Sequence, residues 1–571
     1  MKIKQNLLLL FPTLLFMQCN VKDDTAYKSA LDYKWTSDPV HVYQRSSIDS
    51  TIIPHAMFLE TIWDEKGIIG TLVPIQKTNS TISVKIKYKT DHCEKLSVML
   101  ATIGACERIN AIDTIQLHTT EEWAESTHIV KIKNAHLLNI SIEAAGTVEK
   151  NAEVWISDFE ILINGKSIHT QKKGNIHIRE KDVINWSKHD YHNLPFMEDR
   201  IVALGESAHG TQTMNDLAFS ILKERIVKHQ CTQVMLEIPL EFSFYINRYI
   251  KNDENFKLEE IATYLENSLY SNSLLSFLEW LKEYNLTHDE KVSFWGFDLN
   301  FIEFKSKVDL FNFFYTLNKD LHSKDIDTIC EYLLDMRSYF GEIISICKNS
   351  PNLIRVFHED ELKLMLHCLK VTDKENKRYF RYINRDNAMN EITTFIMDNF
   401  LKDDKTATLY GHLGHLNYLS AQDLSILNFF PFGYYMKNKY KDDYSCIAIT
   451  TNQGSALLTK STAEFGFGDS ELMPAPQESL EYQLNRFKKD SIYLPMRVLD
   501  CGDLLKVRHV GNRDIEEQFR YMIPKSRMDG VLFIKKSFSV EKNDTVLSKN
   551  LHPNHVISTA YKEALDKMRN K

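Results

Sequence analysis

The sequence has no run of lysine and arginine interleaved with aromatic residues, which is the pattern of many nucleic-acid-binding chains. Its net charge at pH 7 is only −8 and its pI is about 6.3. Nothing in this balance favours a nucleic-acid partner. Beyond the N-terminus the chain also has no second long apolar run. A bundle of membrane-spanning helices is therefore not indicated.

Cysteine spacing excludes two further classes. After Cys19 the remaining cysteines are scattered, and none forms a C-x-x-C pair. The sequence therefore predicts neither a zinc ribbon nor a disulfide scaffold. Cys93 and Cys106 are the one local pair expected to be able to form a disulfide in an oxidising periplasm.

The N-terminus resembles a bacterial lipoprotein signal. Lys2 and Lys4 precede an apolar run at residues 7–17, which is too short to span a membrane, and Cys19 follows it. We expect residues 1–19 to be a signal segment with lipidation at Cys19 and residues 20–25 to be a tether. The chain would then be anchored to a membrane of the bacterial cell envelope, facing the periplasm or the cell surface. The alternative is an ordinary signal peptide with an incidental cysteine.

A length of 571 residues with 43% hydrophobic and 26% charged residues predicts a globular chain of two domains. Short segments of period-two alternation fill residues 26–167, so residues 20–170 are predicted to form an antiparallel β-sandwich. The closing VWISDFEILING resembles the last strand of carbohydrate-binding jelly-roll modules. Trp35, Trp63 and Trp123 are candidates to stack on a carbohydrate, and the alternative is that they pack in the core.

After a polar linker at residues 171–197, residues 198–571 show a different layout. This segment contains four apolar runs, each ending in charged or imidazole residues: IVALGESAHG, QVMLEIP, KVSFWGFDLN and TATLYGHLGH. Continuous apolar runs are typical of strands buried on both faces, so we predict an α/β domain with a mainly parallel sheet flanked by helices. Residues 301–400 have helical stripes and almost no strand signal, which predicts a helical insertion.

Charged and imidazole side chains stand at the ends of these runs. In open α/β sheets the ligand site lies outside the carboxyl ends of the strands. We therefore predict one shared site made of Glu206, His209, Glu237, His412 and His415, with Asp298 at the end of a further run. For each residue alone, a helix cap or a satisfied loop polar group is an equally good interpretation.

Four motifs in order, GESAHGT, MLEIP, RDNAMNE and YGHLGH, resemble the erythromycin esterase family. The resemblance implies a hydrolase of carboxylic esters or lactones, with a possible part in antibiotic resistance and no cofactor. It implies that His209 is a general base acting on water, that Glu206 orients it, and that Glu237, His412 and His415 position water and stabilise the oxyanion. It also implies that Arg385 and Asp298 bind substrate, whereas helix spacing alone favours an exposed ion pair for Arg385.

The chain departs from the family pattern at two positions. Ala218 stands where members often have an arginine, and Leu413 stands between the paired histidines in place of asparagine. Both departures put macrolide hydrolysis in question.

Two other functions remain open. His412 and His415, together with His209, Glu206 and Glu237, supply enough nitrogen and oxygen ligands for zinc or manganese. The chain would then be a metal-dependent hydrolase. A catalytically silent surface glycan-binding lipoprotein is the second alternative. No G-x-S-x-G elbow is present, which favours activation of water over a covalent intermediate. The family resemblance gives the catalytic role to the histidine, so Ser207 is a weak candidate for a nucleophile.

Overall fold

The computed structural model describes residues 29–541 and four residues near the C-terminus, 561, 563, 564 and 566. Its internal gaps fall at 34, 38–44, 50–55, 62–65, 148, 172–175, 187–190, 266–270, 301–302, 336, 377–384, 419–429, 460–466 and 512–516. The predicted signal segment with Cys19, the predicted tether and Trp63 lie outside the described residues.

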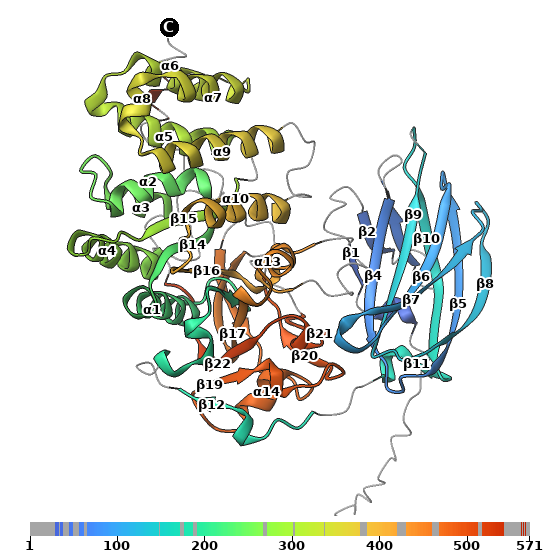
Figure 1. Ribbon diagram of the computed structural model, residues 1–571. Coiled ribbons are helices and arrows are strands. Elements are labelled where there is room, and N and C mark those ends of the chain that lie inside the picture. Colours follow the sequence, from blue (N-terminus) through green and yellow to red (C-terminus); the bar gives the residue numbers. More distant parts are fainter. Residues whose placement is uncertain are drawn as a thin grey trace, which may run out of the picture.

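The N-terminal region contains two antiparallel sheets, which lie on the right in Figure 1. One has the order β1-β4-β9-β6-β7 and the other β2-β3-β10-β5-β8, with β11 paired to β10. Their bounds are β1 Thr36–Ser37, β2 Arg45–Asp49, β3 Ala56–Glu60, β4 Lys66–Pro74, β5 Ser80–Asp91, β6 Lys95–Ile103, β7 Ile109–Leu117, β8 Ala124–Ile132, β9 Leu137–Ala145, β10 Glu153–Ile163 and β11 Lys166–Ser167.

Alternation along these strands separates a core face from a solvent face. On β5, Ile82, Val84 and Ile86 are fully buried, and Ser83 and Lys85 between them are not. One hydrophobic core takes residues from both sheets, among them Val98 and Ile156. The prediction of a β-rich region before the α/β region is confirmed.

The second region is built on a nine-stranded sheet of order β12-β19-β22-β17-β13-β16-β14-β15, with β18 paired to β17. The bounds are β12 Ile184–Asn185, β13 Ile201–Glu206, β14 Cys231–Pro239, β15 Ser293–Asp298, β16 Thr406–His412, β17 Tyr444–Thr459, β18 Phe467–Leu472, β19 Ser491–Pro495 and β22 Gly530–Ser537. Every neighbouring pair from β22 to β15 is parallel, and β12, β18 and β19 add antiparallel partners. The sheet is therefore mainly parallel, and β12 comes from the segment expected to be a linker.

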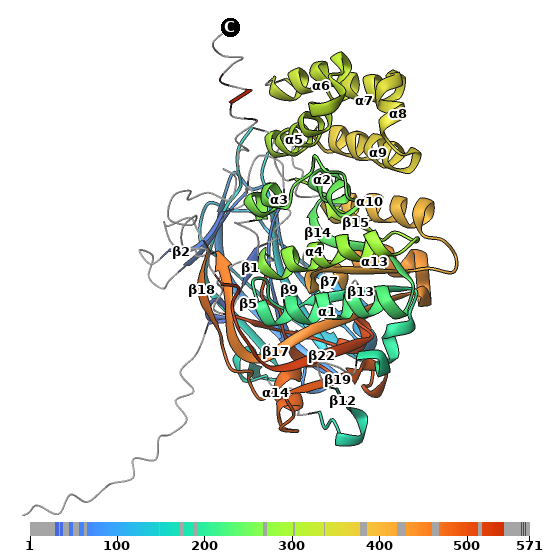
Figure 2. The ribbon, with the colours of Figure 1, turned by 90° about the vertical axis from the view of Figure 1, so that its left-hand side faces the viewer.

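Helices flank this sheet. Figures 1 and 2 show α1 and α4 on one face and α13 and α14 on the other. The bounds are α1 Gln212–Lys228, α2 Leu240–Ile250, α3 Leu258–Leu265, α4 Ser271–Thr287, α11 Leu413–Leu416, α13 Phe432–Tyr440 and α14 Leu480–Asn485. Strand β13 is buried at every residue because both of its faces are covered.

The chain between β15 and β16 is helical, as predicted for residues 301–400. Its helices are α5 Glu303–Leu321, α6 Lys324–Leu334, α7 Phe340–Asn349, α8 Pro351–Val356, α9 Glu359–Asn376 and α10 Arg385–Phe400. Most of them lie together at the upper left of Figure 1, whereas α10 lies against the sheet and packs on β15.

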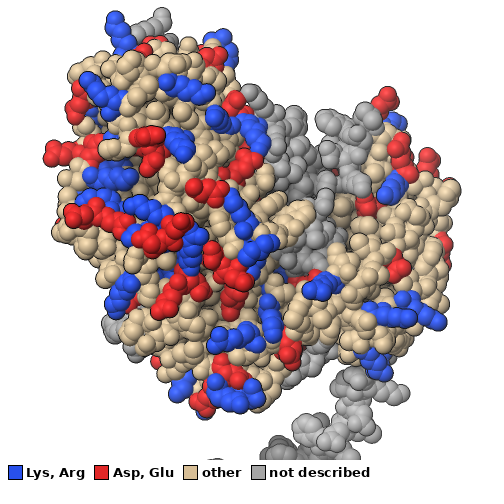
Figure 3. All heavy atoms as spheres, in the orientation of Figure 1, with Lys and Arg blue, Asp and Glu red and all other residues tan. Residues whose placement is uncertain are grey.

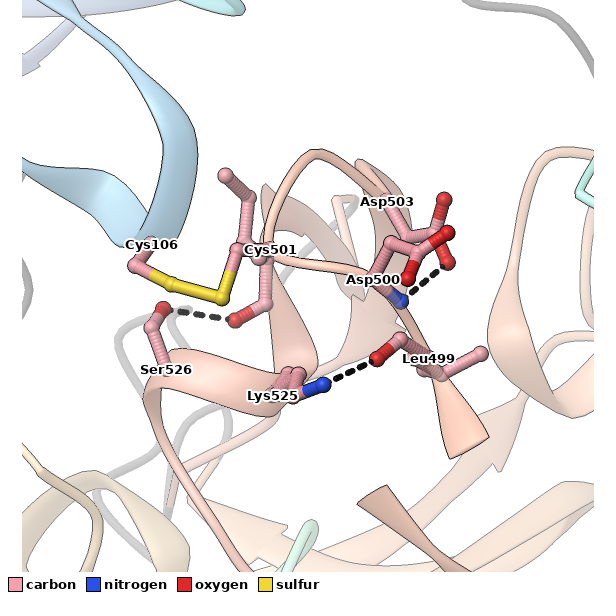
Figure 4. The surroundings of a disulfide bond; sticks show 8 residues. Cys106, Leu499, Asp500, Cys501, Asp503, Lys525 and Ser526 are labelled. Atoms are coloured by element: carbon pink, nitrogen blue, oxygen red, sulfur yellow. Dashed lines mark hydrogen bonds between the residues drawn. A yellow bond between two sulfur atoms is a disulfide. The ribbon is translucent and has the colours of Figure 1, made fainter. Parts of the chain in front are cut away.

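A disulfide cross-links the two regions. Cys106 forms a disulfide with Cys501, across 395 residues of sequence, and Cys93 is a free thiol. The expected Cys93–Cys106 pair is therefore wrong. Figure 4 shows the bond between a loop of the β-rich region and a loop that Lys525 holds by donating to the Leu499 carbonyl at 2.6 Å. Spacing in the sequence points only to local pairs, whereas the fold brings the distant Cys501 next to Cys106.

Next to the disulfide lies a buried contact between the regions. The Glu107 carboxylate accepts from Arg527 Nε at 3.1 Å and from the backbone N–H of Ile523 at 2.5 Å. Ile103 and Leu137 pack there against Leu504 and Ile523. No strand that begins before Ser167 joins the mainly parallel sheet among the described residues.

The surface carries both signs of charge. Figure 3 shows lysine and arginine interspersed with aspartate and glutamate on the face that it draws. Across the residues that the structure describes, no helix is both long and apolar enough to cross a bilayer.

Candidate active site

The turn after β13 places the first two site residues. Glu206 ends the strand and is fully buried, and His209 follows in the turn that leads into α1. Gly210 has φ +68, and a Cβ there would lie 2.1 Å from the Leu457 carbonyl oxygen. Both the left-handed backbone and the close approach require glycine, which explains why the GESAHG motif ends as it does.

Glu206 fixes the tautomer of His209. Oε1 of Glu206 lies 2.6 Å from His209 Nδ1, and its other oxygen accepts from the Tyr410 hydroxyl at 2.8 Å. An ionised carboxylate only accepts, so the His209 proton sits on Nδ1 and Nε2 keeps its lone pair. Burial works against protonation of His209, but the Glu206 carboxylate outweighs it and the pKa of His209 is raised above its ordinary value.

His412 stands beside His209 because Glu206 and His412 are register partners on the neighbouring strands β13 and β16. The ring centroids of His209 and His412 are 4.8 Å apart. His412 Nδ1 accepts from the Gly414 N–H at 3.2 Å, so the proton of the neutral ring is on Nε2. Among the described residues Nε2 is buried and has no hydrogen-bond partner. Burial, together with the nearby His209, holds the pKa of His412 well below its ordinary value.

Glu237, at the end of β14, holds the backbone of His412. Its Oε2 accepts from the His412 N–H at 2.6 Å, and its Oε1 accepts from Arg385 at 2.8 Å. A Cβ on Gly411 would lie 2.7 Å from Oε2, so glycine leaves room for the carboxylate. Burial raises the pKa of Glu237, but the positive groups around it, His415 first, lower it to about 2. Glu237 is therefore ionised across the neutral range.

Arg385 is the first residue of α10 and ties that helix to the strand ends. Its Nε and one terminal nitrogen donate to the two oxygens of Asp298 at 3.0 and 2.7 Å, in a bidentate pair. Its other terminal nitrogen lies 3.1 Å from His415 Nε2. The side chain is only 15% exposed. The exposed ion pair favoured by helix spacing is therefore wrong, because tertiary contacts turn this side chain into the site.

His415 has partners on both ring nitrogens. Its Nδ1 lies 2.8 Å from Asp386 Oδ1, and its neutral Nε2 accepts from Arg385. Burial disfavours its protonation, but Asp386 and then Glu237 raise its pKa above the ordinary value. Protonated Nε2 would face Glu237 Oε1, which is 3.6 Å away. The His412 and His415 rings are 6.2 Å apart, so His415 belongs to the same cluster.

The structure thus gathers every predicted residue of the cluster at the carboxyl edge of the sheet, with Arg385 and Asp298. It also adds Tyr410, Asp386 and His509, which sequence reasoning had not placed in the site. Asp386 belongs to the RDNAMNE motif, which marks it in the sequence. Tyr410 lies within an apolar strand, and nothing in the sequence marks it as a site residue. His509 lies 5.1 Å from His412, ring to ring, and nothing around it in the sequence marks it.

The two departures from the family pattern are both buried. Ala218 is fully buried on α1. Leu413 packs over Gly205, since a Cβ on that glycine would lie 2.8 Å from the leucine side chain. In the part of the chain that the structure describes, no three His, Cys, Asp or Glu side chains are grouped so that they could hold a metal ion.

The sequence model described as erythromycin esterase matches residues 226–331 and 358–537, which is about half of the chain. The match contains Glu237, Asp298, Arg385, His412 and His415, and it begins after His209. An erythromycin esterase type II from Escherichia coli is 23% identical over 310 residues, which cover 47% of this chain and 74% of that protein.

The matches to solved structures are weaker. A Bacillus cereus protein is 16% identical with a TM-score of 0.48, covering 64% of this chain and 97% of its own. An erythromycin esterase mutant in its open conformation is 17% identical with a TM-score of 0.42, covering 62% and 95%. On the extent of the family match, the chain belongs to the erythromycin esterase family.

Proposed function

We propose that this protein hydrolyses a carboxylic ester or lactone, with His209 as the general base that activates water. Family membership supports ester hydrolysis as the class of activity. The observation that carries the mechanism is a pair of adjacent rings in opposite tautomers. His209 offers a lone pair on Nε2, and His412 offers a proton on Nε2, with ring centroids 4.8 Å apart.

The proposed reaction follows from these two atoms. Water loses a proton to His209 Nε2 as its oxygen bonds to the acyl carbon, and the carbonyl oxygen becomes an oxyanion that accepts from His412. When the bond to the alcohol breaks, His209 returns the proton to the leaving oxygen. A positioned base contributes on the order of 10²–10⁴-fold and an oxyanion donor 10²–10³-fold.

The remaining predicted residues support this pair. Glu206 orients His209, and Glu237 holds the His412 backbone at 2.6 Å. We propose that Arg385 and Asp298, with His415, border the substrate and position it rather than carry out bond breaking. Ser207 has no proposed role, although it is buried beside Glu206.

A metal-dependent reaction is the alternative that uses the same residues. The hydrogen-bond partners of the candidate ligands favour the metal-free mechanism. His415 already bonds Asp386 and Arg385, and the Arg385 guanidinium places a positive charge where a cation would have to sit. His412 Nε2 carries the proton of the neutral ring, because Nδ1 accepts from the Gly414 N–H, so it is a hydrogen-bond donor rather than a metal ligand.

The test is hydrolysis of a panel of esters and lactones by the purified chain without its signal segment, with and without EDTA. Erythromycin belongs in the panel because the Escherichia coli relative is named for it. We expect turnover of at least one ester class that EDTA leaves unchanged and that His209→Ala abolishes. Reversible loss with EDTA, with bound metal lowered in His412→Ala and His415→Ala, would establish the metal-dependent alternative instead.

We also propose export and anchoring through a lipid on Cys19. The disulfide between Cys106 and Cys501 supports export, because disulfides persist in oxidising compartments and are rare in the cytosol. Labelling cells with an alkyne-tagged palmitate tests it, since Cys19→Ala should remove the label. A cytosolic, unlabelled protein would refute it.

The N-terminal region, which we take as a β-sandwich domain of residues 20–170 before a catalytic domain of residues 198–571, is proposed to bind carbohydrate. Trp35 stacks on Phe159 and packs against the core of this region, which favours the core-packing interpretation for this residue. Trp123 is 38% exposed, and Lys89 lies 5.6 Å from its ring and 4.5 Å from that of Trp155. Exposed rings beside hydrogen-bond donors suit sugar faces. Retardation of the protein in gels containing polysaccharide, lost in Trp123→Ala, tests this.

A further inference from the structure

The hairpin of β20 Leu505–Arg508 and β21 Phe519–Met522 reaches the site from the C-terminal part of the chain. His509 follows β20, and its N–H donates to the Gln518 carbonyl at 2.8 Å. The next residue, Val510, donates to the Ser207 carbonyl at 2.7 Å. The backbone at His509 is therefore bonded on one side to its own hairpin and on the other to the turn that carries His209.

Arg508 makes this hairpin rigid. It is fully buried, and its guanidinium donates to the carbonyl oxygens of Thr451 and Asn452 at 3.0 and 2.8 Å and to Gln518 Oε1 at 2.7 Å. Such a network allows the backbone little freedom, so the position of His509 is well defined.

The His509 ring lies against His412, on which the proposed reaction depends. Their centroids are 5.1 Å apart. A Cβ on Gly414 would be 2.7 Å from His412 Nδ1 and 3.2 Å from His509 Cε1, so this glycine lets both rings approach the same backbone. Within the described part of the chain, no hydrogen bond joins either ring nitrogen of His509 to another residue. His509 is partly exposed, so a ligand can reach this residue.

The surroundings keep this ring neutral. Burial, followed by the positive charges of Arg520 and Arg527, holds the pKa of His509 well below its ordinary value. A neutral imidazole N–H is a hydrogen-bond donor but a very weak acid, so it can stabilise a developing negative charge without giving up its proton. Transfer of a proton to the leaving alcohol remains with His209.

We propose that His509 is a second oxyanion donor, which binds the substrate carbonyl oxygen beside His412. The inference rests on the proposed ester hydrolysis. As the water oxygen bonds to the acyl carbon, the electron pair of the carbonyl moves onto its oxygen, and that oxygen accepts N–H bonds from His412 and His509. His509 neither gains nor loses a proton, and it forms no bond to carbon.

Three variants test the donor role. His509→Phe keeps a ring of similar size without an N–H, His509→Gln keeps a donor, and His229→Gln is the matched control. His229 is also a partly buried histidine with a lowered pKa, but it caps the other end of α1, next to the start of β16. Each protein is assayed with p-nitrophenyl butyrate and ethyl butyrate, and melting temperatures verify folding.

We expect His509→Phe to lower kcat on the order of 10²-fold for both esters, with the acid limb of the pH profile unchanged. His509→Gln should recover part of that loss, and His229→Gln should behave as wild type. Equal losses for the two esters indicate oxyanion binding, because p-nitrophenolate needs no proton to leave. A loss confined to ethyl butyrate, or a kcat of folded His509→Phe within twofold of wild type, would overturn the proposal.

A binding measurement separates this inference from the proposed function. Butylphosphonate, whose oxygens mimic the oxyanion, is titrated calorimetrically into wild type and His509→Phe. If wild type binds it about tenfold more tightly than the variant yet hydrolyses neither ester, the proposed hydrolysis fails and the role of His509 in anion binding stands. If esters are hydrolysed in a His209-dependent way but both proteins bind alike, the role of His509 fails. Absence of binding and turnover in wild type overturns both.

Discussion

At the residue scale, the partner of Nδ1 determines what each ring can do. His209 has a carboxylate on Nδ1, which accepts, and His412 has a backbone N–H on Nδ1, which donates. Neighbouring imidazoles of the same type are therefore set in opposite tautomers. Their pKa values also move apart, upward for His209 and downward for His412. Such divergence is typical of groups with different catalytic tasks.

Glu206→Gln should separate the orienting role from the charge. Removing the carboxylate removes the main influence that raises the pKa of His209, while burial, which lowers it, remains. His209, the proposed base, is neutral and active above its pKa, so the acid limb of kcat against pH should move to lower pH. The plateau rate should also fall, though less than in His209→Ala, which loses the proposed base.

Rates by pH-stat from pH 5 to 9 measure both effects. Glu224→Gln serves as the control, because that carboxylate lies on α1 and pairs with Lys228 at 2.7 Å. An acid limb that stays in place or moves to higher pH would show that Glu206 does not set the pKa of the catalytic group.

Gly411→Ala should disturb the site through a single methyl group. The new Cβ would lie 2.7 Å from Glu237 Oε2 and displace the carboxylate from the His412 N–H. We expect a loss of about 1–3 kcal/mol in unfolding free energy and a clear fall in kcat. Gly341→Ala is the control, because nothing lies within 4 Å of its Cβ and alanine favours the helix by roughly 0.5–1 kcal/mol.

Thermal unfolding and ester kinetics on the same preparations give both readouts. If Gly411→Ala keeps wild-type stability and kcat, then Glu237 can move freely and does not hold His412.

At the scale of elements, apolar runs that end in charge predicted where the strands deliver their side chains. That inference worked for Glu206, Glu237 and His412 because parallel strands share one carboxyl edge. It failed for residues that enter from outside the strand ends. Arg385 starts a helix, and His509 follows a hairpin strand that pairs outside the main sheet. The partner of Cys106 was missed for the same reason, since local spacing contains nothing about contacts across 395 residues.

Replacing Arg385 should loosen α10 from the sheet in a pH-dependent way. Arg385→Met leaves Asp298 buried without its bidentate partner and Glu237 without its single bond from Arg385. Breaking a buried pair in this way costs about 3–5 kcal/mol. The folded pKa of Glu237 is lowered to about 2, so its ionic stabilisation is present above its unfolded pKa and is lost as pH falls toward 2. The stability difference between wild type and variant should therefore be large at pH 7 and smaller at pH 3.

Chemical denaturation at both pH values measures that difference. Arg337→Met is the control, because Arg337 forms an exposed ion pair with Asp335. An Arg385→Met penalty that is equal at pH 3 and pH 7 would mean that packing, rather than charge, ties α10 to the strand ends.

At the scale of the whole molecule, the β-rich region supports the part of the α/β region that carries His509. The disulfide joins Cys501, just before β20, and Glu107 bonds Ile523, just after β21. Both ends of the hairpin are thus held from the N-terminal region, and a shared apolar cluster lies between them. Sequence alone predicted the two regions but not this attachment.

Breaking the disulfide should therefore weaken the attachment without unfolding either region. Cross-linking positions so far apart in sequence constrains the unfolded chain by up to about 5 kcal/mol in the chain-entropy treatment. We expect Cys106→Ser, or dithiothreitol on the wild type, to lower the melting temperature by several degrees. Cleavage by trypsin between residues 171 and 197 should also become faster. Cys93→Ser removes a free thiol and should change neither the melting temperature nor the cleavage rate.

Because Glu107 and Arg527 still pair across the contact, the two regions of Cys106→Ser should stay packed together. Adding Glu107→Ala to Cys106→Ser should separate them. Equal melting temperatures and cleavage rates for wild type and Cys106→Ser would show that the noncovalent contacts between the regions, the Glu107–Arg527 pair and the shared apolar cluster, hold the attachment without the disulfide.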